Sequence, residues 1–91
     1  MTEEQRIALK IDDLTWREVQ DELLVLDMAT TTYLTLNGSA KVLWECLVDG
    51  ATVTEMAGAL VDRYGIDTGR ARVDAEEFLQ VLEERSFVKP A

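Results

Sequence analysis

Side chains that most often carry out chemistry in proteins are scarce in this sequence. It contains no histidine, and Cys46 is its only cysteine. Because these two residue types supply most zinc ligands, and histidine is the usual general base, the sequence predicts no metal, no cofactor and no catalytic relay. Cys46 lies among apolar residues, which indicates a buried small hydrophobe rather than an activated thiolate. We therefore expect a protein that is not an enzyme.

Acidic residues dominate the charged side chains. The chain has 18 Asp and Glu against 9 Lys and Arg, for a formal net charge of −9, and the basic residues are scattered. Nucleic-acid affinity comes largely from cations that neutralise phosphates, so this chain should repel nucleic acid. We interpret the pairs Glu76–Glu77 and Glu83–Glu84 as solvated helix faces rather than a metal or acid–base site. An acidic domain suits a neutral or basic peptide partner.

The sequence has no segment typical of a membrane span or an export signal. It lacks a run of about 18 apolar residues, which a membrane-spanning helix needs. Its first six residues are polar and acidic, unlike the basic and then apolar layout of a secretory signal. These features predict a cytoplasmic protein that has no membrane partner.

Hydrophobic periodicity divides the chain into a strand-forming first third and a helical remainder. Strands are favoured over Leu14 to Val19, Leu23 to Leu26 and Thr32 to Leu36. The last of these alternates cleanly, so that Leu34 and Leu36 share one face. Short connections between the three segments predict an antiparallel meander.

Three short helices should follow this sheet. Apolar residues at i, i+3, i+4 and i+7 mark the first helix. They are Ala40, Leu43, Trp44 and Leu47. Thr52 and Glu55 have the spacing of a capping box at the start of the second helix, which Gly65 should end. Asp67 is a good N-cap for the third helix. The buried face of that helix is predicted to hold Ala71, Ala75, Phe78, Leu79 and Leu82.

The predicted fold class is α+β, with a three-stranded antiparallel sheet followed by three helices. This layout resembles a winged helix-turn-helix in rearranged order. Residues 14–88 should form one domain, and residues 1–13 an N-terminal extension. Because Ile7, Leu9 and Ile11 alternate, the extension is expected to be either an extra edge strand before the meander or a flexible segment.

The third predicted strand is the best candidate for a binding surface. Thr31 to Leu36 carries no charge and no proline, the features that usually protect an exposed edge. Such an edge can accept an extended peptide as an added strand, unless another part of the domain covers it. Each added hydrogen bond contributes about 0.5–1.5 kcal/mol, and ordering each peptide residue costs about 1–2 kcal/mol. Binding therefore needs apolar anchors beside the strand.

The third helix offers one wall for such an anchor site. At about 100° per residue, Asp74 and Val81 fall on a flank of its core stripe, with Arg70 just beyond. Phe78 and Val81 would form the floor of a groove, and Arg70, Asp74 and Glu77 its rim. The alternative is that Val81 is an isolated exposed hydrophobe, which needs no function.

An ordered set of residues from about Leu14 to Val88 resembles the PqqD-like family. The set comprises Leu26–Asp27, Tyr33–Asn37, Ala40, Leu43–Trp44, Leu47, Asp49–Gly50, Thr52, Glu55, Asp74, Phe78–Leu79, Leu82 and Phe87–Val88. Ser86 stands where domains of this family usually have glycine before the last apolar pair.

The resemblance implies a recognition element for ribosomally made precursor peptides, which binds the leader segment of the precursor. Members take the leader as an added antiparallel strand between the third strand and the third helix. By this resemblance, backbone pairing would involve Thr31, Thr32, Tyr33, Leu34 and Thr35, and the cleft would be lined by Asp74, Phe78 and Val81. A stand-alone chain of this size resembles the lasso-peptide type, which delivers the precursor to a leader peptidase before a cyclase acts.

Two other functions remain open from the sequence. The first is a PqqD-type peptide chaperone that serves a radical-SAM enzyme, as in the biosynthesis of pyrroloquinoline quinone. The second is a winged-helix DNA-binding regulator, which would need a basic recognition helix. The third predicted helix instead carries Asp74, Glu76, Glu77, Glu83 and Glu84 against Arg70, Arg72 and Arg85.

Overall fold

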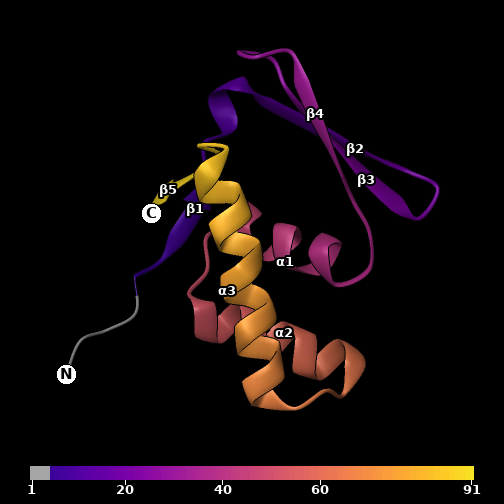
Figure 1. Ribbon diagram of the computed structural model, residues 1–91, viewed down its shortest axis with the longest axis vertical. Helices are drawn as coiled ribbons and strands as arrows, with labels where there is room; N and C mark the ends of the chain where they lie inside the picture. Colours follow the sequence, from indigo (N-terminus) through magenta and orange to yellow (C-terminus); the bar gives the residue numbers. More distant parts are fainter. Residues whose placement is uncertain (1–4) are drawn as a thin grey trace.

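A three-stranded meander leads into three helices, and a small two-stranded sheet joins the two ends of the chain (Figure 1). The computed structural model describes residues 5–91. The strands are β1 (Ile7–Leu9), β2 (Leu14–Val19), β3 (Glu22–Asp27), β4 (Thr32–Leu36) and β5 (Val88–Pro90). The helices are η1 (Ile11–Asp13), a 3-10 turn, and then α1 (Gly38–Val48), α2 (Val53–Tyr64) and α3 (Thr68–Glu84). This order confirms the predicted α+β architecture.

The meander has the strand order β2-β3-β4, with both pairs antiparallel. Trp16, Val25 and Leu34 stand opposite one another across the three strands, and their side chains face the helices as part of the core or packed against it. Tyr33 and Thr35 point to the other face, and Tyr33 is 68% exposed. The alternation predicted for the third strand is therefore confirmed.

Asp27 holds the turn between β3 and β4. Its carboxylate accepts hydrogen bonds from the Ala29 N–H at 3.0 Å and from the Thr30 hydroxyl at 2.8 Å. The turn ends at Thr31, which has a φ of 58°. This left-handed backbone is not compatible with an extended strand, so the inclusion of Thr31 in the predicted binding edge is wrong, whereas the strand predicted over Thr32 to Leu36 is confirmed. The strand begins at Thr32.

The alternating residues near the N-terminus do form a strand, but not an edge strand of the meander. β1 pairs with β5, and Ile7 exchanges backbone hydrogen bonds with Ala51 at 2.8 and 2.9 Å. The side chain of Leu9 enters the common core, which explains why β1 lies against the helices rather than beside β2. Residues 1–4 of the predicted extension lie outside the described residues.

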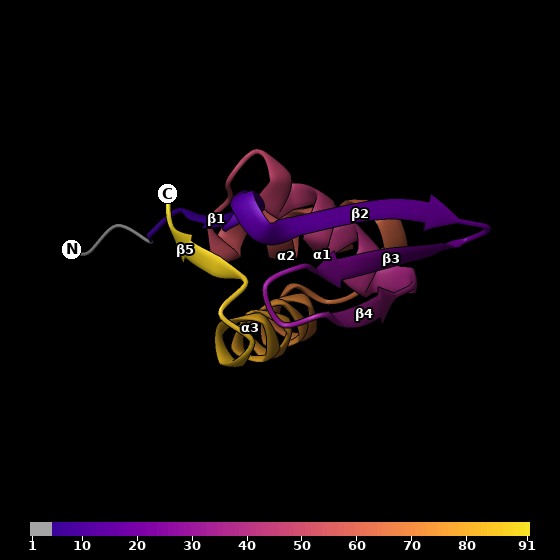
Figure 2. The ribbon, with the colours of Figure 1, turned by 90° about the horizontal axis from the view of Figure 1, so that it is seen from above.

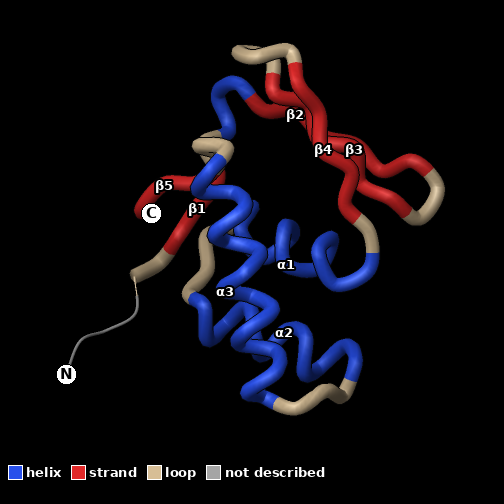
Figure 3. Tube along the Cα trace, viewed as in Figure 1, coloured by secondary structure: helices blue, strands red, loops and turns tan. Residues whose placement is uncertain are grey.

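Local sequence signals set the helix ends (Figure 3). At the start of α2 the Glu55 N–H donates to the Thr52 hydroxyl at 3.1 Å, and the Thr52 N–H donates to the Glu55 carboxylate at 3.0 Å. This is the predicted capping box. Gly65 ends α2 with a φ of 65°, and the Asp67 carboxylate caps α3 by accepting from the Gly69 and Arg70 N–H groups.

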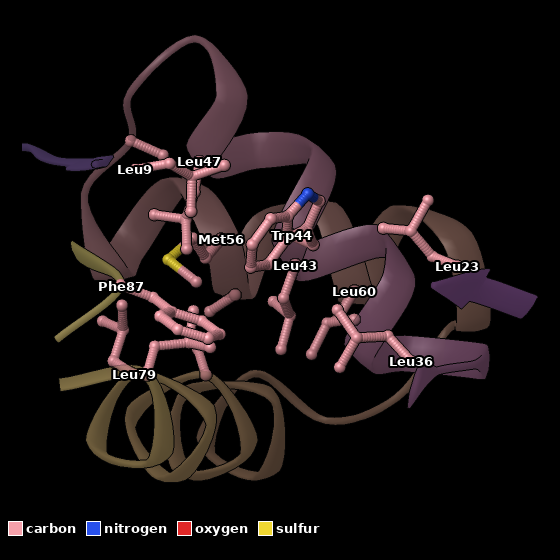
Figure 4. Close-up of a cluster of buried hydrophobic side chains, with 14 of the residues drawn as sticks. Leu9, Leu23, Leu36, Leu43, Trp44, Leu47, Met56, Leu60, Leu79 and Phe87 are labelled. Atoms are coloured by element: carbon pink, nitrogen blue, oxygen red, sulfur yellow. The ribbon is translucent and has the colours of Figure 1, made fainter. Parts of the chain in front are cut away.

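Trp44 lies at the centre of the core (Figure 4). Its ring makes edge-on contacts with Trp16 of β2, at a centroid distance of 5.4 Å, and with Phe87, at 6.5 Å. Its indole N–H has no hydrogen-bond partner among the described residues. Trp16 thus packs β2 against α1, and the apolar face predicted for the first helix, which includes Trp44, is turned into the core.

The end of α3 explains the unusual Ser86. The Phe87 N–H donates to the Leu82 carbonyl at 2.9 Å, and the Ser86 N–H donates to the Glu83 carbonyl at 3.0 Å. This pair of bonds is a Schellman motif, which places Ser86 at the left-handed position where glycine is favoured. Ser86 has a φ of 60° and therefore carries backbone strain that glycine would not.

We expect Ser86→Gly to stabilise the domain by up to about 1 kcal/mol, because relief of left-handed strain should exceed the extra entropy of glycine in the unfolded chain. Urea unfolding followed by tryptophan fluorescence measures this change. Gly58→Ser, in the middle of α2, is the matched control, because it exchanges the same two residue types at a position with ordinary helical backbone. A lower stability for Ser86→Gly would show that the serine side chain contributes something beyond its backbone.

Cys46 of α1 is half-buried, in partial agreement with the prediction of a buried hydrophobe. Burial raises the pKa of its thiol, and the neighbouring charges of Glu45 and Glu55 raise that pKa further. A raised pKa leaves less thiolate near neutral pH, and the thiolate is the nucleophile.

Alkylation of Cys46 by iodoacetamide should therefore be slower in the folded chain than in the urea-unfolded chain. Mass spectrometry of timed samples gives both rates. The folded rate should rise with pH beyond the range in which an ordinary thiol has already ionised. Faster alkylation of the folded chain near neutral pH would contradict the raised pKa and would reopen the question of a reactive thiol.

Candidate peptide-binding groove

β4 forms a free edge of the meander. It pairs with β3 on one side, and no other strand among residues 5–91 pairs with it on the other. Figure 2 shows β4 at the edge of the sheet on the side where α3 lies, with β2 at the opposite edge. Alternate residues of such an edge direct their N–H and C=O groups outward. Backbone partners are thus available along Thr32–Leu36.

Residues of α3 and α1 line an open groove of about 410 Å³ close to the end of this strand. Its α3 wall is formed by Arg70, Asp74, Glu77, Phe78 and Val81, which are the helix residues predicted from the sequence. Phe78, which was predicted on the buried face of the helix, is only half-buried, and Val81 is 43% exposed. An apolar surface is therefore open to a ligand side chain on this flank of α3.

The opposite wall of the groove comes from the first turns of α1. Ser39, Ala40 and Leu43 line it. Sequence reasoning placed Ala40 and Leu43 on the core stripe of α1 and did not predict that they also border the groove. The small side chain of Ala40 was the one available signal, because it leaves room between the two helices. The predicted strand residues, in contrast, do not line the groove.

Acidic groups predominate at the rim of the groove. Arg70 forms an i,i+4 ion pair with Asp74, with 3.5 Å between Nε and Oδ1. Glu77 has no ion-pair partner within residues 5–91. The rim therefore carries one uncompensated negative charge, which favours a hydrogen-bond donor or a cation on a ligand.

A second hollow, of about 520 Å³, lies at the start of β4. The β3–β4 turn contributes Ala29 and Thr30 to it, and the end of α3 contributes Arg85, Ser86 and Phe87. We call it the turn hollow. The sequence did not predict this hollow, because it joins segments that are far apart in the chain.

Other kinds of site receive no support from the described part of the chain. No cluster of three or more His, Cys, Asp or Glu side chains within residues 5–91 could hold a metal ion. None of the helices described is both long enough and apolar enough to cross a membrane.

Comparison with known proteins identifies a family that this chain matches. Residues 22–88, from β3 into β5, match the family described as coenzyme PQQ synthesis protein D (PqqD). The chain belongs to the PqqD family. The matched region includes β4 and all of α3, so the free edge and the groove both lie within the PqqD domain.

Two solved structures share the fold of this PqqD domain. One is TbiB1 in complex with the TbiA(beta) leader peptide, with a TM-score of 0.81 and 23% identity over 90% of this chain and 94% of that chain. The other is lasso peptide synthetase B1 complexed with the leader peptide, with a TM-score of 0.80 and 21% identity over 92% of this chain and 98% of that chain. No curated protein matches the chain in sequence.

The groove makes a prediction about two adjacent residues of α3. Val81→Asp should lower the free energy of unfolding by no more than about 1 kcal/mol, because Val81 is 43% exposed and a carboxylate there can stay in contact with water. Leu82→Asp should cost about 3 kcal/mol or more, because it buries a carboxylate in the core. Urea titration compares the two variants. Similar large losses for both would mean that Val81 is a core residue and that the groove is closed.

Proposed function

We propose that this chain is a non-catalytic adaptor that binds the leader segment of a ribosomally made precursor peptide and delivers it to a processing enzyme. The observation that carries this proposal is the free, uncharged edge of β4 beside an apolar groove on α3. The edge offers backbone partners, and the groove offers a place for a side-chain anchor. Together they suit an extended peptide.

The expected binding mode is β-strand addition. A leader segment would lie antiparallel to β4 and pair with the outward backbone groups of residues from Thr32 to Thr35. Thr31 is left out of this pairing because it lies in the turn. The free energy gained from the added hydrogen bonds is nearly cancelled by the entropic cost of ordering the peptide. The net affinity must therefore come from apolar burial.

The groove supplies this burial. An apolar side chain of the leader would rest on Phe78 and Val81, opposite Leu43. Each anchor that becomes fully buried contributes about 1.5–3 kcal/mol. Arg70, Asp74 and Glu77 at the rim would orient polar groups of the leader rather than provide most of the affinity.

Similar structures support the lasso-peptide class. Both similar structures are described as complexes with a leader peptide, and one of the proteins is named lasso peptide synthetase B1. By analogy, we propose that this adaptor acts in the cytoplasm with a separate leader peptidase, followed by a cyclase. The chain itself would contribute recognition and no catalytic group.

The family description favours a second candidate. A relative of coenzyme PQQ synthesis protein D would instead present its peptide to a radical-SAM enzyme. Both candidates require leader binding at β4 and differ in the enzyme that receives the peptide. Reconstitution with each kind of enzyme distinguishes them, because only the true partner should process its precursor faster when the adaptor is added.

A backbone scan tests strand addition directly. A synthetic leader peptide, taken from a precursor whose gene neighbours the gene for this chain, should bind with roughly micromolar affinity, about −8 kcal/mol. N-methylation of its backbone amides, one at a time, should weaken binding at every second residue across the paired segment, because only alternate amides of an added strand face β4. Fluorescence anisotropy measures each affinity.

Val81→Asp provides the protein-side control. This variant should stay folded and should bind the unmodified leader at least about tenfold more weakly, because it places a charge against the apolar anchor. Val73→Asp, at another exposed valine of α3 outside the groove, should bind as the parent does. An N-methyl profile without two-residue periodicity would rule out strand addition, and the absence of any leader binding would rule out the adaptor function.

A further inference from the structure

Three cations gather at the turn hollow. Lys10, Arg85 and Lys89 all line it, although the chain has only 9 basic residues and a net charge of −9. None of the three forms an ion pair with a carboxylate among residues 5–91. In so acidic a chain, three cations without ion-pair partners around one hollow provide local attraction for an anion.

Three carboxylates, those of Asp12, Asp13 and Asp27, line the same hollow, so the cations act there against acidic neighbours. Asp27 is 7% exposed, and both of its oxygens accept hydrogen bonds within the turn. Asp12 and Asp13 belong to η1, which leads into β2, and the Asp13 carbonyl accepts a hydrogen bond from the Met28 N–H of the β3–β4 turn at 2.8 Å. Arg85 caps α3, on the side of the sheet where β4 is free (Figure 2).

The two hollows lie at opposite ends of β4. The strand starts from the turn that lines the turn hollow, through Ala29 and Thr30, and it leads into α1, whose Ser39 and Ala40 line the groove. A strand added antiparallel to β4 therefore has its N-terminal end at the groove and its C-terminal end at the turn hollow. β4 has 5 residues, so a peptide segment of similar length separates the two hollows.

We propose that the turn hollow is a second recognition site, which binds the carboxylate side chain of an Asp or Glu about five residues after the apolar anchor of the bound peptide. Arg85 would hold this carboxylate, because a guanidinium group can donate two parallel hydrogen bonds to it. Lys89 and Lys10 would add to the attraction. This inference rests on the proposed function and adds to it the charge and the direction of the bound segment.

The same arrangement favours one order of charges along the bound peptide. Glu77 at the groove favours a basic or donor residue near the N-terminal end of the segment, whereas the cations at the turn hollow favour an acid near its C-terminal end. A peptide with the reverse order of charges would meet like charges at both ends. Binding should accordingly select one direction of the chain.

Selection from a random-sequence peptide library tests this proposal without a known leader. The peptides are displayed through their C-termini, so any selected carboxylate belongs to a side chain. The wild-type domain should enrich peptides in which an Asp or Glu follows the apolar anchor at the stated spacing. The double variant Arg85→Glu and Lys89→Glu should lose or reverse this preference while keeping the preference for the anchor.

The matched control is Arg17→Glu with Arg63→Glu, which changes the net charge equally but lies outside both hollows. One enriched peptide is then resynthesised with its acid replaced by the corresponding amide. The replacement should weaken binding to the wild type and to the control by about two- to fivefold, and should not weaken binding to Arg85→Glu with Lys89→Glu. The difference should shrink as salt is added.

The outcomes of the selection distinguish the second recognition site from the adaptor function itself. Enriched peptides that share an apolar anchor but no acid at the stated position would overturn the second site and leave the adaptor function standing. An acid preference that survives in the Arg85 and Lys89 double variant would overturn it as well. If the wild-type domain enriches no peptide at all, the proposed function fails together with this inference.

Discussion

One buried side chain, Trp44, connects the sheet to the end of α3. It contacts Trp16 of β2 on one side and Phe87, just after α3, on the other. Because a close-packed aromatic cluster is hard to compress, these contacts fix the distance between the meander and α3. That distance keeps α3 beside β4 without covering its edge. The open edge and the groove are thus consequences of how the core is packed.

Much of the fold follows from local signals in the sequence. The capping box of Thr52 and Glu55 and the N-cap at Asp67 depend only on neighbouring residues, so their spacing predicted the helix starts correctly. Pairings between residues far apart in the chain could not be predicted from such local signals. The pairing of β1 with β5 depends on the meeting of the two ends of the chain, and the left-handed Thr31 depends on the turn that Asp27 holds.

The candidate site shows the same division. Helical periodicity identified the α3 wall of the groove, because residues four apart share a face whatever the rest of the fold does. The α1 wall and the turn hollow needed the tertiary structure, since they join Ala40 to Phe78 and Lys10 to Arg85. In the proposed complex, the edge strand would supply pairing that does not depend on the peptide sequence, and the hollows at its two ends would supply the discrimination.

Amide hydrogen exchange resolved by NMR tests the central claim most directly. With a bound leader peptide, the outward amides of β4 should become protected at alternate residues, while those of β2, the opposite edge, should exchange as before. Protection confined to β2 or to the outer face of the helices, with β4 unchanged under saturating peptide, would contradict recognition by strand addition.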